Sequence, residues 1–130
     1  MVVDASALVA IALEEPEADA LSGRLNAAAI ALTHPLSVYE AVLAVTRELK
    51  QPPYVTYRDL SDFMSAAGIE VVDIGSAETI AALEAFTRYG KGQKHPAQLN
   101  MGDCFSYACA KLRGMPLLYK GDDFARTDLA

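Results

Sequence analysis

The chain begins with MVVDASALVAIALE (residues 1–14), in which two valines precede an acid and a run that suits a helix. Val2 and Val3 predict a short buried strand, and residues 5–14 predict a helix that Pro16 ends. Asp4 falls between them, at the carboxyl end of the strand. A strand that passes directly into a helix is the repeating unit of α/β proteins.

The rest of the chain continues this alternation of short apolar strands and helices. We expect strands at 30–33, 69–74 and 117–119, and helices at 17–28, 35–49, 56–67, 76–89 and 100–113. Thr56, Ser76 and Asn100 are the expected helix caps. Residues 89–98 predict a loop. The pattern predicts an α/β three-layer sandwich with a short, mainly parallel central sheet flanked by helices.

The bulk composition suits one folded domain, which we expect to span residues 1–130. Hydrophobic residues make up 52% of the chain, enough for a sizeable core. We find neither a signal peptide nor a membrane-spanning stretch, so a cytoplasmic protein is expected. Cys104 and Cys109 lie five apart in a predicted helix, which favours two reduced buried thiols. The net charge of −6 argues against a basic nucleic-acid binder, unless carboxylates gathered at one site bind cations.

Five acidic residues occupy positions that can converge. Asp4, Asp122 and Asp123 follow predicted strands at their carboxyl ends, Asp103 lies in a first helical turn, and Glu40 lies in an apolar segment. Each has an ordinary explanation as a helix cap, a turn residue or a half-exposed acid. Together they would meet at one edge of the sheet, where functional crevices of such sheets lie.

Carboxylates that converge repel one another, and a divalent cation removes that cost. Mg²⁺ or Mn²⁺ bound there can activate water and stabilise the transition state of phosphoryl transfer. We therefore predict a metal-dependent hydrolytic site. Ser6 is the hydroxyl nearest in sequence to Asp4 and is assigned to positioning, with a plain helix-start serine as the alternative.

Four segments occur along the chain in the order MVVDASAL (1–8), SVYE (37–40), LNMGDCFSYA (99–108) and LLYKGDDF (117–124). This ordered set resembles PIN-domain ribonucleases, specifically the VapC toxins of bacterial type II toxin–antitoxin pairs. The resemblance covers essentially the whole chain. Single motifs such as Asp-x-Ser are weak, whereas the ordered set is specific.

The resemblance implies that Asp4 and Asp103 bind the metal and that Glu40 completes the site as a ligand or by holding a water. Asp122 is the expected fourth acid, acting through a bound water, and Asp123 is given a structural role. Many relatives place this acid slightly earlier, where the chain has Gly121. The family also implies an RNA substrate, a homodimer and a small antitoxin protein that blocks the groove.

RNA contacts would need positive charge near the acids. The candidates are Arg88, Lys91 and Lys94 around a glycine-containing loop, and Lys120 beside the acidic turn. The alternative is a solvated loop without a binding role.

Three other functions are considered at this point. A receiver-type signalling domain would use Asp73 as phosphoacceptor with Lys120, but it needs an acidic pair after the first strand, where only Asp4 stands. A phosphatase of the haloacid-dehalogenase type would need an acid at position 6, which is Ser6. The third is a non-enzymatic protein-binding scaffold, in which the acids are helix caps.

Overall fold

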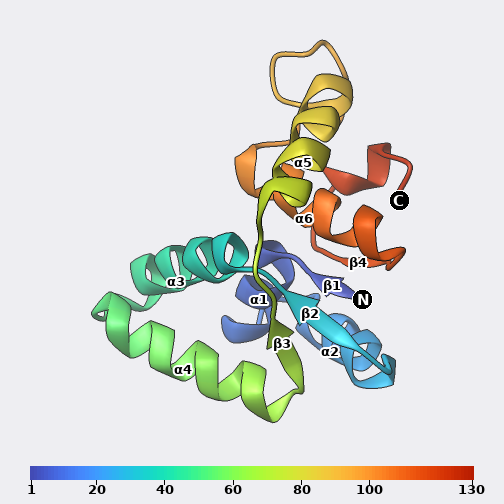
Figure 1. Cartoon of the computed structure of the whole chain (residues 1–130). Helices are drawn as coiled ribbons and strands as arrows, with labels where there is room; N and C mark the ends of the chain where they lie inside the picture. Colours follow the sequence, from blue (N-terminus) through green and yellow to red (C-terminus); the bar gives the residue numbers. More distant parts are fainter.

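A four-stranded parallel sheet lies at the centre of the computed structural model, which describes all 130 residues (Figure 1). The strand order is β3-β2-β1-β4, and each neighbouring pair is parallel. The strands are β1 (Val2–Val3), β2 (Ala31–Thr33), β3 (Ile69–Val71) and β4 (Leu117–Leu118). Parallel neighbours require crossover connections, and helices provide them here.

Six helices surround this sheet, so the predicted sandwich architecture is confirmed. They are α1 (Ala5–Ala12), α2 (Ala18–Ala27), α3 (Pro35–Leu49), α4 (Pro53–Ala66), α5 (Ser76–Tyr89) and α6 (Met101–Arg113), followed by the short 3₁₀ helix η1 (Phe124–Arg126). None of these helices has both the length and the apolar character that crossing a membrane requires.

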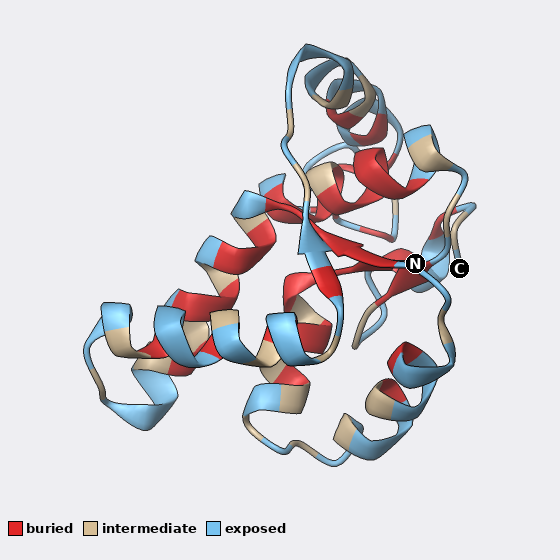
Figure 2. Ribbon diagram, turned by 60° about the horizontal axis from the view of Figure 1, so that its bottom comes forward, coloured by how far each residue is buried: buried red, intermediate tan, exposed pale blue.

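Two apolar cores cover the two faces of the sheet. Val3 and Leu118 belong to a cluster with residues of α1 to α4, whereas Val2 and Leu117 belong to a cluster with residues of α5 and α6. Successive strand residues point to opposite faces, which explains why neighbouring residues enter different cores. Strands β1, β2 and β4 are entirely buried, whereas two of the three residues of β3 are exposed; Figure 2 shows the buried strands at the centre of the molecule.

Helix α4 begins at Pro53, three residues before the predicted start, so the expected cap at Thr56 is wrong. The ring of Pro53 fixes a φ that suits the first helical position, and Pro52 is extended. Thr56 is instead buried within the first turn, where its hydroxyl accepts hydrogen bonds from Thr46 Oγ1 and Gln51 Nε2, each at 2.8 Å.

Several other boundaries differ from the predictions, most of them by one or two residues; α1, for example, ends at Ala12 and not at residue 14. Strand β3 ends at Val71, because its partner strand β2 ends at Thr33. The cap of α5 is Gly75 and not Ser76, since the Glu78 side chain accepts a hydrogen bond from the Gly75 backbone N–H. The Asn100 cap and the start of α3 at Pro35 are as predicted.

Candidate active site

One pocket of about 310 Å³ lies at the carboxyl ends of β1 and β4 and between α1, α3 and α6. Its lining includes Asp4, Glu15, Glu40, Asp103 and Asp123. Four separate stretches of the sequence thus contribute carboxylates to one pocket. The remaining lining residues are Ala5, Ser6, Val9, Ala44, Asn100 and Lys120.

Asp4 is held rigidly at the base of this pocket. Its Oδ2 accepts hydrogen bonds from the Ser6 backbone N–H at 3.0 Å and from Ser6 Oγ at 2.7 Å. Its Oδ1 accepts a hydrogen bond from Ser106 Oγ at 2.6 Å, and the residue is only 4% exposed. Asp4 is therefore the N-terminal cap of α1, which is the ordinary explanation considered for it from sequence. Its carboxylate also lines the pocket.

Asp103 occupies the third position of α6 and forms a reciprocal cap with Asn100. The backbone N–H of Asp103 donates to Asn100 Oδ1 at 2.9 Å, and Asp103 Oδ2 accepts from the Asn100 backbone N–H at 3.1 Å. Burial is the main cause that raises the pKa of Asp103 to about 7. The nearby charges of Asp4, Asp123 and Glu40 add to this rise, and the hydrogen bond from the Asn100 backbone opposes it. The site therefore resists holding all its negative charges at once.

The raised pKa of Asp103 predicts that the stability of the metal-free protein depends on pH. The ordinary pKa of Asp103 is 3.8 and the folded value is higher, so the folded state holds its proton more tightly. The tighter proton binding of Asp103 therefore adds to the free energy of unfolding. This contribution is complete below about pH 4 and is lost as the pH rises to about 7. Urea unfolding in EDTA should show that wild type loses stability relative to Asp103→Asn over this range. The loss is at most on the order of 4 kcal/mol, and a difference that stays constant with pH would contradict the assignment.

Glu40 reaches the pocket by lying over a glycine. A Cβ placed on Gly102 would be 1.7 Å from Glu40 Oε1 and 2.5 Å from Glu40 Cδ, so no side chain fits there while Glu40 keeps its place. Burial raises the pKa of Glu40, and the charge of Asp4 adds to the rise. Glu40 makes no ion pair with any basic side chain.

Asp123 is the fourth acid of the pocket besides the Lys120-paired Glu15, whereas the sequence predicts Asp122. Asp122 is exposed and is absent from the pocket lining. Gly121 has a φ of +97°, a conformation that favours glycine and turns the chain so that the second acid faces the site. Asp123 also acts on Asp103, since its charge contributes to the raised pKa there. Both residues are exposed, but only Asp123 lines the pocket.

Lys120 lies at this pocket but is already paired. Its ammonium group contacts Glu15 and lies 3.4 Å from Glu17 Oε2, and its backbone N–H donates to Ser6 Oγ at 3.0 Å. No basic side chain lies within 4 Å of the carboxylates of Asp4, Glu40, Asp103 or Asp123. These four negative groups therefore lack a cation supplied by the chain.

The other basic candidates lie outside the pocket. Arg88 stacks over the Tyr89 ring at 4.6 Å and lies 3.9 Å from Asp128. Lys91 and Lys94 are exposed. These three side chains are absent from the lining of the acidic pocket. Asp73 is also exposed and is not part of that lining.

Oxygen-rich, uncompensated carboxylates are what Mg²⁺ and Mn²⁺ prefer as ligands, so the donor set fits such an ion. No three acidic, histidine or cysteine side chains are arranged to hold a metal ion directly. Mg²⁺ commonly takes one or two carboxylates and keeps several waters. The pocket therefore suits a cation with two direct carboxylate ligands and the other acids acting through water.

Two residues that are not among the candidates from sequence, Ser106 and His34, support Asp4 on the side away from the pocket. Ser106 donates to Asp4 Oδ1, and His34 Nε2 lies 3.0 Å from Ser106 Oγ. Both are fully buried. Two signals were present: Ser106 lies three residues after Asp103 and so shares its helix face, and His34 directly follows a predicted strand.

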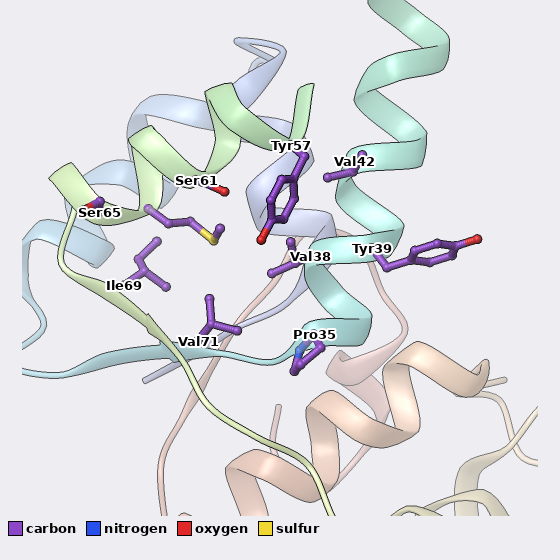
Figure 3. A pocket seen from close by; sticks show the side chains of 10 residues that line it. Pro35, Val38, Tyr39, Val42, Tyr57, Ser61, Ser65, Ile69 and Val71 are labelled. Carbon is purple, nitrogen blue, oxygen red and sulfur yellow. The ribbon is translucent and has the colours of Figure 1, made fainter. Parts of the chain in front are cut away.

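A larger hollow lies elsewhere, between α3, α4 and β3. Figure 3 shows Tyr57, Val38 and Val71 among the side chains around this mostly apolar groove, which measures about 500 Å³. It contains no acidic or basic side chain. Its chemistry cannot activate water, so the smaller acidic pocket is the better candidate for catalysis.

Comparison with known proteins gives consistent results. The family model described as the PIN domain matches residues 1–129. Ribonuclease VapC30 of Mycobacterium tuberculosis is 40% identical over 130 residues, covering 100% of this chain and 96% of that protein. VapC ribonuclease R02377 of Rhizobium meliloti is 44% identical over 139 residues, covering 98% and 97% of the two chains.

A solved structure has a similar fold. The crystal structure of Mycobacterium tuberculosis VapC20, described as a sarcin-ricin loop cleaving toxin, superposes with a TM-score of 0.75 at 14% sequence identity. The match covers 99% of this chain and 95% of the other. At this identity the likeness establishes the shared architecture.

Proposed function

Because this chain belongs to the PIN-domain family, we propose that it is a metal-dependent endoribonuclease and the toxin of a toxin–antitoxin pair. The relatives that align over nearly their whole length carry the name ribonuclease. Neither the receiver-type nor the scaffold alternative is supported by these relatives. The whole chain, residues 1–130, would form the single nuclease domain.

The observation that carries the proposal is the group of four carboxylates without a neutralising side chain. Asp4, Glu40, Asp103 and Asp123 line one pocket, and none forms an ion pair. Asp4 and Asp103 are buried, and buried charge of one sign is costly unless it is compensated. A bound divalent cation supplies that compensation, which a purely structural role for the acids would leave unexplained.

Asp4 and Asp103 would ligate Mg²⁺ or Mn²⁺, since both are buried and point into the pocket. Glu40 and Asp123 would hold waters of the ion, with Asp123 taking the part first given to Asp122. The bound ion supplies an activated water and compensates charge on the phosphate. The Ser6 hydroxyl donates a hydrogen bond to Asp4 Oδ2 and accepts one from the Lys120 backbone N–H. It would therefore link the segments that follow β1 and β4 at the site.

RNA binding would depend strongly on the cation. The net charge of the chain is −6, and Lys120 is occupied by Glu15 and Glu17. Lys91 and Lys94 remain exposed and free to meet a phosphate backbone at a distance from the pocket. Arg88 would contribute less, because it stacks on Tyr89.

The partners we propose are the RNA substrate, a small antitoxin protein and a second copy of the chain, in the cytoplasm. The relatives' names and the toxin described for the solved structure support the first two. An antitoxin that presents a basic side chain to the acidic pocket would replace the cation and block cleavage.

Purified protein incubated with transfer, ribosomal and messenger RNA provides the direct test. We expect internal cuts with Mg²⁺ or Mn²⁺ and no cuts in EDTA, because the uncompensated carboxylates repel phosphate. Sequencing of the cut ends would identify the target and distinguish endonucleolytic cleavage from trimming. Cleavage that persists in EDTA would contradict the metal requirement, and the absence of cleavage in all three RNA classes would contradict the proposal.

A further inference from the structure

Counting hydrogen-bond donors shows which oxygen of Asp4 remains available. Each carboxylate oxygen accepts about two hydrogen bonds. Oδ2 already receives two donors from Ser6, its backbone N–H and its hydroxyl, whereas Oδ1 receives one from Ser106 Oγ. The free acceptor position is therefore on Oδ1, the oxygen that Ser106 holds.

Ser106 is placed so that it acts only through Asp4. It is fully buried and does not line the pocket, so it cannot touch RNA. Its hydroxyl has a single hydrogen, which the 2.6 Å contact with Asp4 Oδ1 uses. A short bond from a neutral hydroxyl to a carboxylate is among the stronger hydrogen bonds in proteins.

His34 and Ser37 fix the direction of that hydroxyl. The Ser37 backbone N–H donates to His34 Nδ1 at 3.3 Å, so the hydrogen of the neutral ring is on Nε2. Nε2 lies 3.0 Å from both Ser106 Oγ and Ser37 Oγ, and the two hydroxyl oxygens are 3.2 Å apart. In this tautomer the His34 ring cannot accept the hydrogen of the Ser106 hydroxyl. The Asp4 carboxylate is the nearest acceptor and the only charged one among the contacts of Ser106, so the hydroxyl donates to it.

We propose that Ser106 is a positioning residue that fixes Asp4 Oδ1 for cation binding, with the Nε2–H of His34 orienting its hydroxyl. The inference rests on the proposed function, since it assigns a role toward the cation of that site. Outer hydrogen bonds of this kind set the orientation of a metal ligand and its affinity for the ion. Without the Ser106 hydroxyl, Asp4 Oδ1 loses the hydrogen bond that fixes its orientation toward the pocket.

The test is Mn²⁺ binding to the RNA-free protein, measured by isothermal titration calorimetry. Ser106→Ala should raise the Kd for Mn²⁺ roughly tenfold to hundredfold. His34→Asn keeps an acceptor for the Ser37 N–H but lacks the Nε2 donor, so it should weaken binding as well. His34→Gln can place its amide nitrogen near the Nε2 position, and it should keep an affinity closer to that of wild type.

Thr56→Val is the matched control, because it removes another buried hydroxyl of similar size that does not line the acidic pocket. It should leave the Mn²⁺ affinity unchanged. Equal Kd values for wild type and Ser106→Ala, or equal losses in Ser106→Ala and Thr56→Val, would overturn the inference alone. A wild-type protein that binds no Mn²⁺ would overturn the proposed function, and with it this inference.

Discussion

Asp103→Asn is expected to reduce RNA cleavage about a thousandfold or more while the protein stays folded. Asp103 is one of the two carboxylates proposed as direct ligands, and charge compensation by a bound ion is worth several kcal/mol in the transition state. An asparagine oxygen can still accept the Asn100 N–H, so the helix cap survives. Cleavage rates with saturating Mg²⁺, together with far-ultraviolet circular dichroism, provide the measurement.

The adjacent acids of the final turn supply a matched pair of controls. Asp123→Asn should lower the cleavage rate, because Asp123 lines the pocket. Asp122→Asn removes the same charge one residue away, outside the pocket, and should stay close to wild-type activity. Full activity in Asp103→Asn would refute its role as a ligand. A strong effect of Asp122→Asn with none of Asp123→Asn would restore the assignment first made from sequence.

The overall fold and the gathering of acids could be predicted because both follow from local patterns. Short apolar strands alternate with helices, and parallel strands bring their carboxyl ends to one edge of the sheet. Asp4 comes directly after β1, and Asp103 lies in the first turn of α6 behind the Asn100 cap. These positions are set within a few residues of each acid, so the sequence alone reveals them.

Other features of the site depend on contacts between distant segments. Ser106 and Asp4 are 102 residues apart. The helical spacing places Ser106 on the same face as Asp103, but it does not show that the Ser106 hydroxyl reaches Asp4. The choice between Asp122 and Asp123 depends on the turn at Gly121, where a single residue of register reverses which side chain faces the pocket. Lys120 was expected to meet RNA, but Glu15 and Glu17 reach it from the segment between α1 and α2.

Gly102→Ala should lower the cleavage rate about a hundredfold although alanine favours a helix. Gly102 lies in α6, where alanine is preferred over glycine by about 1 kcal/mol. The added Cβ would stand 1.7 Å from Glu40 Oε1, so the Glu40 carboxylate must leave its present position. Displacement of a catalytic group by about 1 Å can cost about a hundredfold in rate. Single-turnover cleavage would measure the effect separately from product release.

Gly23→Ala is the control for this change, since Gly23 also lies in a helix and has open space around its Cα. It should keep full activity. If Gly102 acts through Glu40, the double variant Gly102→Ala with Glu40→Ala should be no slower than Glu40→Ala alone, because the second change has nothing left to displace. Additive losses would show that Gly102 matters for another reason. Unchanged activity in Gly102→Ala would show that the position of Glu40 over this glycine is not needed for cleavage, and that two carboxylates suffice.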